Sequence, residues 1–356
     1  MPLPARSRAL LLLTLLLPLV VLASACSPPQ DAAPTVPPIP FDLPVVVVKF
    51  FPVAGDSIDR ATTGDWGRSL AFTRTKTDSA TVRLIRALEE GTRFHGYKGA
   101  QAPASLSYRV LETYEFLEPL PTVARPGREV PMTDYRGILT QIEAERWVTQ
   151  HGVKEFWIWG YHGGVLDLWE SNMAGPYGDV SNSDRDTTDL PVFGSTYTVY
   201  HYNYQRGVAE AAENHMHQLE AVLNAIDGRD TTAAIGWPNL LFWGKFVGSD
   251  STHRIVPPAR AGWSHYPPNA VRDYDWANRD TVLTDIEAWQ PDGPGPQHRL
   301  NCEAWACDHL GWFIYWTQNM PGHENGLTYQ GKPLHNWWRF LGDYDGARAL
   351  GLRLSQ

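Results

Sequence analysis

The sequence predicts an α/β fold: a mainly parallel buried sheet flanked by helices and long functional loops, in a single domain over residues 41–356. The first observation is the run FDLPVVVVKFFPV at 41–53, whose β-branched residues lack the alternation of a half-solvated strand. The second is a helical pattern at 134–151 that ends at Gly152 and precedes the apolar run VKEFWIWG, as in a helix–strand unit of a parallel sheet. No internal repeat or second linker divides this domain.

The other elements follow from the spacing of their apolar residues. Strands have continuous or alternating apolar residues, and we expect them at 41–53, 105–117, 153–160, 195–204 and 310–318. Helices have apolar residues every three or four positions, and we expect them at 81–95, 134–151, 206–226 and from His335 to Leu341. The loop at 161–196 is rich in Gly, Asn, Asp and Ser, and loops of this length in compact domains are usually functional.

The N-terminal sequence MPLPARSRALLLLTLLLPLVVLASAC has the pattern of an export signal. Arg6 and Arg8 precede an apolar run that is short for a transmembrane helix and ends in small residues. The segment LASAC resembles a bacterial lipobox, and this resemblance implies that Cys26 becomes the lipidated first residue of the mature chain. We therefore predict a lipoprotein signal peptide at 1–25, with a simple secretion signal or an uncleaved anchor as the alternatives.

A proline-rich tether follows at 26–40, beginning with the lipidated Cys26. Its sequence SPPQDAAPTVPPIP contains six prolines and no aromatic residue, which favours an extended chain without a core. The predicted location is the bacterial cell envelope, with the exported protein anchored at a membrane surface. Membrane lipid is therefore one predicted partner, and no pattern specifies the oligomeric state.

The two remaining cysteines agree with an oxidising compartment. Once Cys26 is used for lipidation, Cys302 and Cys307 are left, and an even remainder favours a disulfide. This spacing requires a turn over 303–306, because a straight strand would hold the two Cα atoms too far apart. Two buried free thiols are the alternative.

Composition and absent motifs exclude several classes of protein. A net charge of −9 and a pI near 5.7 disfavour a nucleic-acid partner, because an acid excess repels phosphate. The chain lacks Gly-x-Ser-x-Gly, Gly-x-Gly-x-x-Gly, Walker and His-Glu-x-x-His motifs, which disfavours esterases, dinucleotide enzymes, ATPases and zincins. No motif specifies a cofactor, and the sequence leaves open whether the protein binds a divalent metal ion. Fifteen tryptophans instead favour a surface on which sugar rings stack.

Polar residues follow the predicted strand VKEFWIWG. In α/β folds, functional residues gather on loops at the carboxyl ends of strands. His162 and Glu170 are therefore candidate catalytic residues, and a carboxylate beside an indole suits a general acid. Tyr161, Trp169 and Asn172 in the same loop are candidate substrate-binding residues. The alternatives are a structural loop histidine and an exposed glutamate.

The helix predicted at 206–226 carries histidines and acidic residues on two faces. At 100° per residue, His215 lies beside the apolar stripe, and we consider it a further catalytic candidate. Glu213, His217 and Glu220 lie together on another face. His215 and His217 stand about 200° apart and cannot share a metal. His217 and Glu220, three residues apart, are the candidate metal ligands, with a solvated polar face as the alternative.

Two further segments contribute candidates. The segment GWSHYPPNAVRDYD supplies His265 and Asp275 as candidate catalytic residues, and its prolines would stiffen a pocket wall. Trp263 and Tyr266 from the same segment are candidate substrate-binding residues. Asn319 follows the run LGWFIYWTQ and is the last candidate of this kind.

Three functions remain open from the sequence. The favoured one is a lipid-anchored hydrolase of a glycan, in which carboxylates such as Glu170, Asp275, Asp285 and Glu287 supply a catalytic pair. The second is a glycan-binding or structural envelope lipoprotein without catalysis. The third is a metal-dependent hydrolase of a peptide or phosphoester, which would rest on His162, His217, Glu220 and His265. We also expect His162 and His215 to meet in one pocket.

Overall fold

The computed structural model describes residues 38–356, apart from residues 100, 168, 184–188 and 231–235. The predicted signal peptide at 1–25, the lipidation site Cys26 and the tether as far as residue 37 lie outside the described residues. Pro38–Gln356 cluster into one compact unit. In the part of the chain that is described, no helix is both long enough and apolar enough to cross a membrane.

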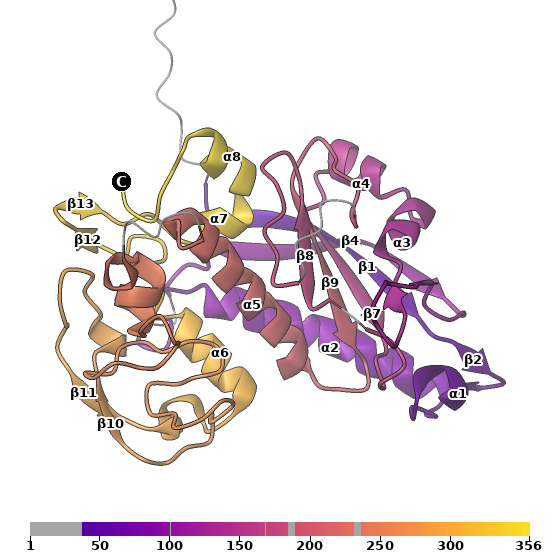
Figure 1. Ribbon diagram of the computed structural model, residues 1–356, viewed down its shortest axis with the longest axis horizontal. Coiled ribbons are helices and arrows are strands. Elements are labelled where there is room, and N and C mark those ends of the chain that lie inside the picture. Colours follow the sequence, from indigo (N-terminus) through magenta and orange to yellow (C-terminus); the bar gives the residue numbers. More distant parts are fainter. Residues whose placement is uncertain (1–37, 100, 168, 184–188, 231–235) are drawn as a thin grey trace, which may run out of the picture. The chain divides into compact units, whose positions relative to one another are not determined.

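A five-stranded sheet lies at the centre of this unit (Figure 1). Its first four strands run parallel to one another, and the last strand pairs antiparallel with its neighbour. The predicted α/β fold with a mainly parallel sheet is therefore confirmed. From one edge to the other, the strands are β4 (Leu106–Phe116), β1 (Phe41–Phe50), β7 (Glu155–Gly160), β9 (Tyr197–Asn203) and β8 (Ser171–Ala174).

Bulky side chains on the inner strands form the core. Val45 to Val48 of β1 are at most 1% exposed, and so are Trp157 and Trp159 of the neighbouring β7. Eleven of the fifteen tryptophans are buried, and the half-buried ones are Trp66, Trp237, Trp263 and Trp276. The abundance of tryptophan therefore serves mainly the core rather than an exposed surface for sugar rings.

Three helices pack against one another: α2 (Leu70–Gly91), α5 (Val208–Asp227) and α6 (His309–Thr317). Helix α2 lies on β4, whereas α5 lies on β8 and β9 (Figure 1). Ser69 begins α2 by accepting a hydrogen bond from the backbone N–H of Phe72, and Gly228 ends α5 in the left-handed conformation. Helix α5 thus contacts both the sheet, at β8 and β9, and the helices α2 and α6.

Shorter elements connect these parts. The short helices are α1 (Arg60–Thr63), α3 (Tyr135–Gln141), α4 (Ala144–His151), α7 (Arg339–Gly342) and α8 (Tyr344–Ala349), with 3-10 helices at Trp237–Asn239, Ile286–Ala288 and Cys302–Trp305 and a π-helical segment at Leu241–Val247. The paired short strands are β2 (Val53–Ala54) with β3 (Ser57–Ile58), β5 (Thr122–Val123) with β6 (Met132–Thr133), β10 (Val282–Thr284) with β11 (His298–Leu300), and β12 (Thr328–Tyr329) with β13 (Lys332–Pro333).

The strand predicted at 310–318 was wrong, because this segment forms most of helix α6. A short run that is apolar throughout does not distinguish a buried strand from a buried helix. The local signal for a helix is Asp308, whose side chain accepts a hydrogen bond from the backbone N–H of Gly311. The predicted terminal helix from His335 also begins later, at Arg339.

Two predicted helices have different bounds. Helix α2 begins at Leu70 rather than at Thr81, because Thr73 and Thr77 occupy buried positions where the pattern expects apolar residues. Each of these threonine hydroxyls donates to the carbonyl four residues earlier, which satisfies it inside the core. The helix predicted at 134–151 is divided into α3 and α4 by Glu143, which has a left-handed φ of 53°.

The predicted disulfide joins Cys302 and Cys307. The 3-10 helix that starts at Cys302 makes the required turn, and it brings the two Cα atoms to 4.5 Å. Ala306 and Cys307 continue the turn with φ values of 58° and 51°. The turn predicted at this place is therefore confirmed.

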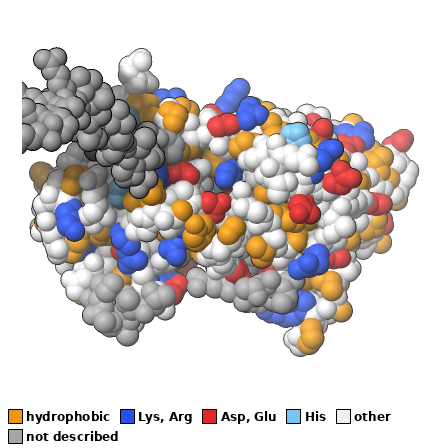
Figure 2. All heavy atoms as spheres, turned by 90° about the horizontal axis from the view of Figure 1, so that it is seen from above, with side chains coloured by type: hydrophobic (Ala, Val, Ile, Leu, Met, Phe, Trp, Pro, Cys, Tyr) orange, Lys and Arg blue, Asp and Glu red, His pale blue; other side chains and the backbone are white. Residues whose placement is uncertain are grey.

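Charged side chains of both signs occupy the face of the molecule seen in Figure 2. Among the described residues of this face, acidic and basic side chains lie between apolar and neutral ones. The acid excess behind the net charge of −9 is therefore not gathered into one acidic patch there.

Candidate metal centre and adjoining cavity

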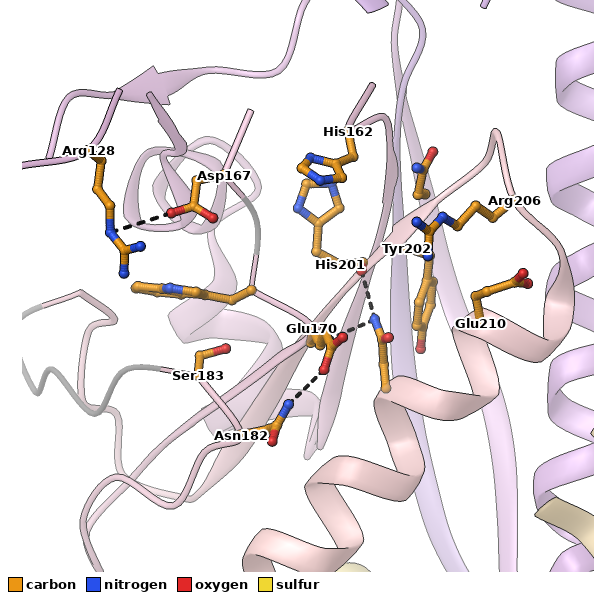
Figure 3. A pocket seen from close by; sticks show the side chains of 13 residues that line it. Arg128, His162, Asp167, Glu170, Asn182, Ser183, His201, Tyr202, Arg206 and Glu210 are labelled. Carbon is orange, nitrogen blue, oxygen red and sulfur yellow. Dashed lines mark hydrogen bonds and ion pairs between the residues drawn. The ribbon is translucent and has the colours of Figure 1, made fainter. Parts of the chain in front are cut away.

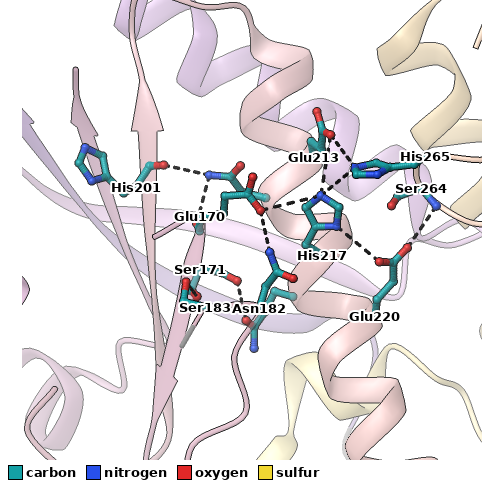
Figure 4. A network of polar contacts seen from close by, with 12 residues as sticks. Glu170, Ser171, Asn182, Ser183, His201, Glu213, His217, Glu220, Ser264 and His265 are labelled. Carbon is teal, nitrogen blue, oxygen red and sulfur yellow. Dashed lines mark hydrogen bonds and ion pairs between the residues drawn. The ribbon is translucent and has the colours of Figure 1, made fainter. Parts of the chain in front are cut away.

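Two side chains of helix α5 meet a histidine from a distant loop. Glu213 and His217 are four residues apart and therefore project from one face of the helix. His265 reaches them with its Nε2 atom, which is 2.9 Å from Glu213 Oε1 and 3.1 Å from His217 Nε2 (Figure 4). One ligand atom from each of the three residues lies within 4.8 Å of the other two. All three side chains are largely shielded from solvent.

The spacing of these atoms fits a divalent metal ion. Nitrogen and oxygen ligands lie about 2.0–2.1 Å from zinc, so tetrahedral geometry separates neighbouring ligand atoms by about 3.4 Å. The observed separations are 2.9 Å, 3.1 Å and, between His217 Nε2 and Glu213 Oε1, 3.8 Å. Two histidines and one carboxylate would leave one position open, which is the arrangement of a catalytic rather than a structural site.

Carboxylates lie behind both histidines. Glu220 Oε2 is 3.4 Å from His217 Nδ1, and the other oxygen of Glu220 accepts a hydrogen bond from the backbone N–H of Ser264. Asp273 Oδ1 is 4.0 Å from His265 Nδ1. A carboxylate at Nδ1 is the usual support for a histidine that binds a metal through Nε2. Glu220, predicted as a ligand, is thus placed behind His217 as a supporting group.

The charges around His217 attract a cation. Burial by itself would lower the pKa of His217, but hydrogen bonds to Glu213 and Glu220 and the charge of Glu170 outweigh it and raise the pKa to about 10. Burial likewise would raise the pKa of Glu213, yet the neighbouring imidazoles of His217, His265 and His309 hold it far below its usual value. The site therefore stabilises positive charge at its centre.

His309 lies beside the second carboxylate oxygen of Glu213. This histidine is the first residue of α6, and its Nε2 lies 3.4 Å from Glu213 Oε2. Its ring stacks on Trp276 with centroids 3.4 Å apart, which fixes the ring plane. Among the described residues, the buried Nε2 has no hydrogen-bond partner, so it faces the carboxylate of Glu213 at ion-pair distance without a hydrogen bond. His309 thus positions the carboxylate of Glu213 toward the two other histidines.

Replacing His309 with phenylalanine tests this positioning role. His309→Phe keeps a ring against Trp276 but removes the nitrogen beside Glu213, so we expect metal affinity to fall by about 10- to 100-fold. Competition with a chromophoric chelator measures the affinity, and chemical unfolding of the metal-free protein serves as the control. An unchanged affinity, or a loss matched by lower stability of the metal-free protein, would contradict the role.

A cavity of about 460 Å³ lies beside the metal centre, and Figure 3 shows the side chains that line it. Glu170 belongs to both, because it lines the cavity and its Oε2 is 3.8 Å from His217 Nε2. Asn182 donates a hydrogen bond of 2.6 Å to the same oxygen. Asn214 of α5 donates to the backbone carbonyls of Glu170 and His201, which ties this part of the cavity to the helix of the metal centre.

The cavity lies at the strand ends, where we expected the functional loops. His162 follows the end of β7, and His201 lies near the end of β9, and both line the cavity. The Nδ1 atom of His201 is 3.0 Å from the hydroxyl of Tyr135, and burial lowers the pKa of His201 to about 3. Its Nε2 is buried and, within the described part of the chain, has no hydrogen-bond partner.

His215 does not join His162 in this cavity. Its ring is buried and stacks on Tyr200 at 3.8 Å, and its Nε2 is 2.6 Å from the hydroxyl of Tyr202. Burial lowers the pKa of His215 to about 3. The structure therefore places His215 in the aromatic core, on the side of α5 opposite His217, and we assign it no role in the site.

The other candidates of the long loop differ in their surroundings. Trp169 lines the cavity, but it is only 6% exposed and its ring stacks on Tyr135. Tyr161 is buried, and its hydroxyl accepts a hydrogen bond from the backbone N–H of Leu120. Asn172 is buried as well, and its amide donates to Asp189. Tyr161 and Asn172 thus stabilise the loop rather than face the cavity.

Candidates from the later segments lie around the metal centre or away from it. Trp263 packs beside His265 and stacks on Tyr266, so both support the loop that carries the histidine. Asp275 accepts a hydrogen bond from Asn278 within its own loop. Asn319 is buried and accepts a hydrogen bond from the hydroxyl of Tyr97.

The carboxylates considered as a glycosidase pair have separate partners. Asp285 is buried in an ion pair with Arg260, with an N–O distance of 3.0 Å. Glu287 accepts a hydrogen bond from Tyr315 and pairs with Lys98. The cavity is lined by Glu170 but not by Asp285 or Glu287.

Sequence reasoning missed two members of this centre. The sequence places Glu213 on the face of His217 without marking it as a ligand, and it shows His309 only as a neighbour of the two cysteines. The i, i+4 spacing of Glu213 and His217 was the available signal.

The chain matches no protein-family model, and a search of the curated proteins finds no protein similar to it.

Proposed function

We propose that the protein is a metal-dependent hydrolase, in which Glu213, His217 and His265 hold a divalent metal such as zinc. The observation that carries this proposal is the spacing of their three ligand atoms, with separations of 2.9 Å, 3.1 Å and 3.8 Å. The carboxylates behind both histidines support it, because they orient the Nε2 atoms toward one point.

The chemistry divides between the metal and one carboxylate. A bound divalent ion would lower the pKa of a coordinated water and polarise a carbonyl or phosphoryl oxygen. Glu170 lies at the border between the cavity and the centre, where its carboxylate can accept the proton of the attacking water. Asn182 orients this carboxylate through its hydrogen bond to Oε2. Glu170 can then return the proton to the leaving group.

This assignment is favoured over its alternatives by particular contacts. A glycosidase needs two free carboxylates across one cleft, whereas Asp285 and Glu287 are engaged with Arg260 and Tyr315. Of the carboxylates that line the cavity with Glu170, Asp167 is paired with Arg128 and Glu210 accepts a hydrogen bond from Gly207. Two histidines and one carboxylate also hold iron in oxygenases, but a carboxylate placed for proton transfer, as Glu170 is, favours hydrolysis.

We also propose that the enzyme works outside the cytoplasm, anchored through Cys26. The disulfide between Cys302 and Cys307 supports an oxidising compartment, because cytosolic thiols are kept reduced. The sequence pattern of the N-terminal 26 residues supports export and lipidation independently of the disulfide.

Glu170→Gln tests the proposed reaction. Metal-loaded wild-type protein is assayed against chromogenic acyl esters, acyl amides and phosphoesters, with and without a chelator. We expect Glu170→Gln to lower turnover of the accepted substrate by about 100-fold at unchanged metal content, because the amide cannot accept the proton. Glu145→Gln, exposed on α4, is the control for removal of a carboxylate. Hydrolysis that survives chelation, or full activity of Glu170→Gln, would contradict the proposal.

A further inference from the structure

We propose that the cavity beside the metal centre binds a saccharide, so that the hydrolysed bond is an amide or ester bond of an acyl substituent on a glycan. The inference rests on the proposed metal-dependent hydrolysis for its chemistry, but the binding step stands by itself. The charge, the polarity and the unpartnered atoms of the cavity wall support it.

The charge of the wall disfavours an anionic ligand. Among the described residues, two arginines and three carboxylates line the cavity, which leaves these residues with a formal charge of −1 when the histidines are neutral. Arg128 is in an ion pair with Asp167, with an N–O distance of 3.8 Å. A site for a phosphoester or a carboxylate would instead carry an excess of cationic groups. In the metal-free protein, a neutral ligand therefore fits better.

The part of the wall that the described residues form also lacks a large apolar surface. Trp169 is the largest apolar group of the lining, and it is only 6% exposed because its ring packs on Tyr135. Tyr202 directs its hydroxyl away to His215, with which it forms a hydrogen bond. An apolar peptide side chain would find few partners here, whereas a ligand rich in hydroxyl groups would satisfy the polar wall.

Two imidazoles offer hydrogen bonds that the described residues do not use. His201 Nε2 and His162 Nδ1 are both buried without a partner. The side chain of His201 is almost completely buried, and its low pKa keeps the ring neutral. An unpaired buried polar atom is costly, and a neutral imidazole nitrogen is well matched by a hydroxyl group, which can donate or accept. Both residues line the cavity, and we assign their rings to the recognition of sugar hydroxyl groups.

Glu170 carries the proton in the proposed hydrolysis of the acyl bond. Water adds to the acyl carbon, the C–N or C–O bond to the sugar breaks, and a carboxylic acid and a sugar amine or hydroxyl leave. Glu170 accepts one proton from the water and passes it to the departing nitrogen or oxygen, so that no other reactant is needed.

Binding to metal-free protein tests the saccharide site separately from the metal. The probes are the pentamer of N-acetylglucosamine and acetylated xylo-oligosaccharides, titrated calorimetrically in the presence of a chelator. We expect saturable binding by the wild type, at least tenfold weaker binding by His162→Ala and by His201→Phe, and no change for His151→Ala, an exposed histidine on α4. His162 is only half-buried, whereas His201 is buried. Weaker binding by His162→Ala therefore tests the saccharide site even if His201→Phe fails to fold.

The outcomes separate this inference from the proposed function. Saccharide binding with release of acetate after metal loading supports both. Saccharide binding by a protein that takes up no metal overturns metal-dependent hydrolysis and the deacylation, but keeps the saccharide site. Metal-dependent turnover of phosphoesters or peptides without any saccharide binding overturns the inference and keeps the proposed function.

Discussion

The variant His217→Ala is expected to bind a divalent metal at least about 1,000-fold more weakly than the wild type, a loss of about 4 kcal/mol. His217 is the central member of the site, because its Nε2 faces both Glu213 and His265 and its Nδ1 faces Glu220. Removing a ligand costs more than the 10- to 100-fold typical of a supporting residue such as His309. Competitive titration against a chromophoric chelator measures the difference.

Two further variants make this result decisive. Glu213→Gln keeps the volume of the side chain and should show a loss of the same order, which excludes a cavity in α5 as the cause. His151→Ala removes an exposed histidine of α4 and should keep the wild-type affinity. An affinity of His217→Ala within tenfold of the wild type would show that the metal, if any, binds elsewhere.

Replacing Glu155 with glutamine is expected to stabilise the protein in neutral and alkaline solution. Glu155 is buried in β7, and its carboxylate accepts a hydrogen bond of 2.7 Å from the indole of Trp157. Burial raises the pKa of Glu155 to about 8, although the hydrogen bond from Trp157 opposes the shift. Glutamine resembles the protonated carboxyl group and keeps an acceptor for the indole.

The sign of the pH dependence follows from the direction of this shift. The unfolded chain loses the proton of Glu155 near the ordinary glutamate pKa of 4.5, whereas the folded protein keeps it up to about pH 8. Stability is therefore lost as the pH rises between these values. The gain from Glu155→Gln should be near zero at pH 4.5, about 3 kcal/mol at pH 7 and about 5 kcal/mol above pH 8.5.

Urea unfolding of both proteins across this pH range measures the gain. Glu145→Gln, exposed on α4, controls for removal of a negative charge. A gain that does not change between pH 4.5 and pH 8.5, or a loss of stability at all pH values, would contradict the account of Glu155 as a buried, protonated group.

The fold was predictable where the pattern of apolar residues is unambiguous. The β-branched run of β1 and the helix–Gly–strand unit before β7 predicted the parallel sheet correctly. The prediction failed for α6, where uniform apolarity carries no period, and for the start of α2, where Thr73 and Thr77 replace apolar residues. In both places, tertiary packing decides what the local pattern leaves open.

The site was predictable only within single elements. The helical projection placed Glu213 and His217 on one face of α5 and separated them from His215, as the structure shows. The approach of His265 was not predictable, because it joins residues about 50 positions apart through an irregular loop. His309 was missed for the same reason, since its neighbour Glu213 lies almost 100 positions earlier.

The position of a bound metal tests the central claim most directly. Crystals grown with zinc and measured at the zinc absorption edge should show one anomalous peak at about 2.0–2.2 Å from Glu213, His217 and His265. The same crystals of His217→Ala should lack this peak. A stoichiometric peak at other residues, or no peak between these three side chains in crystals saturated with zinc, would contradict the account.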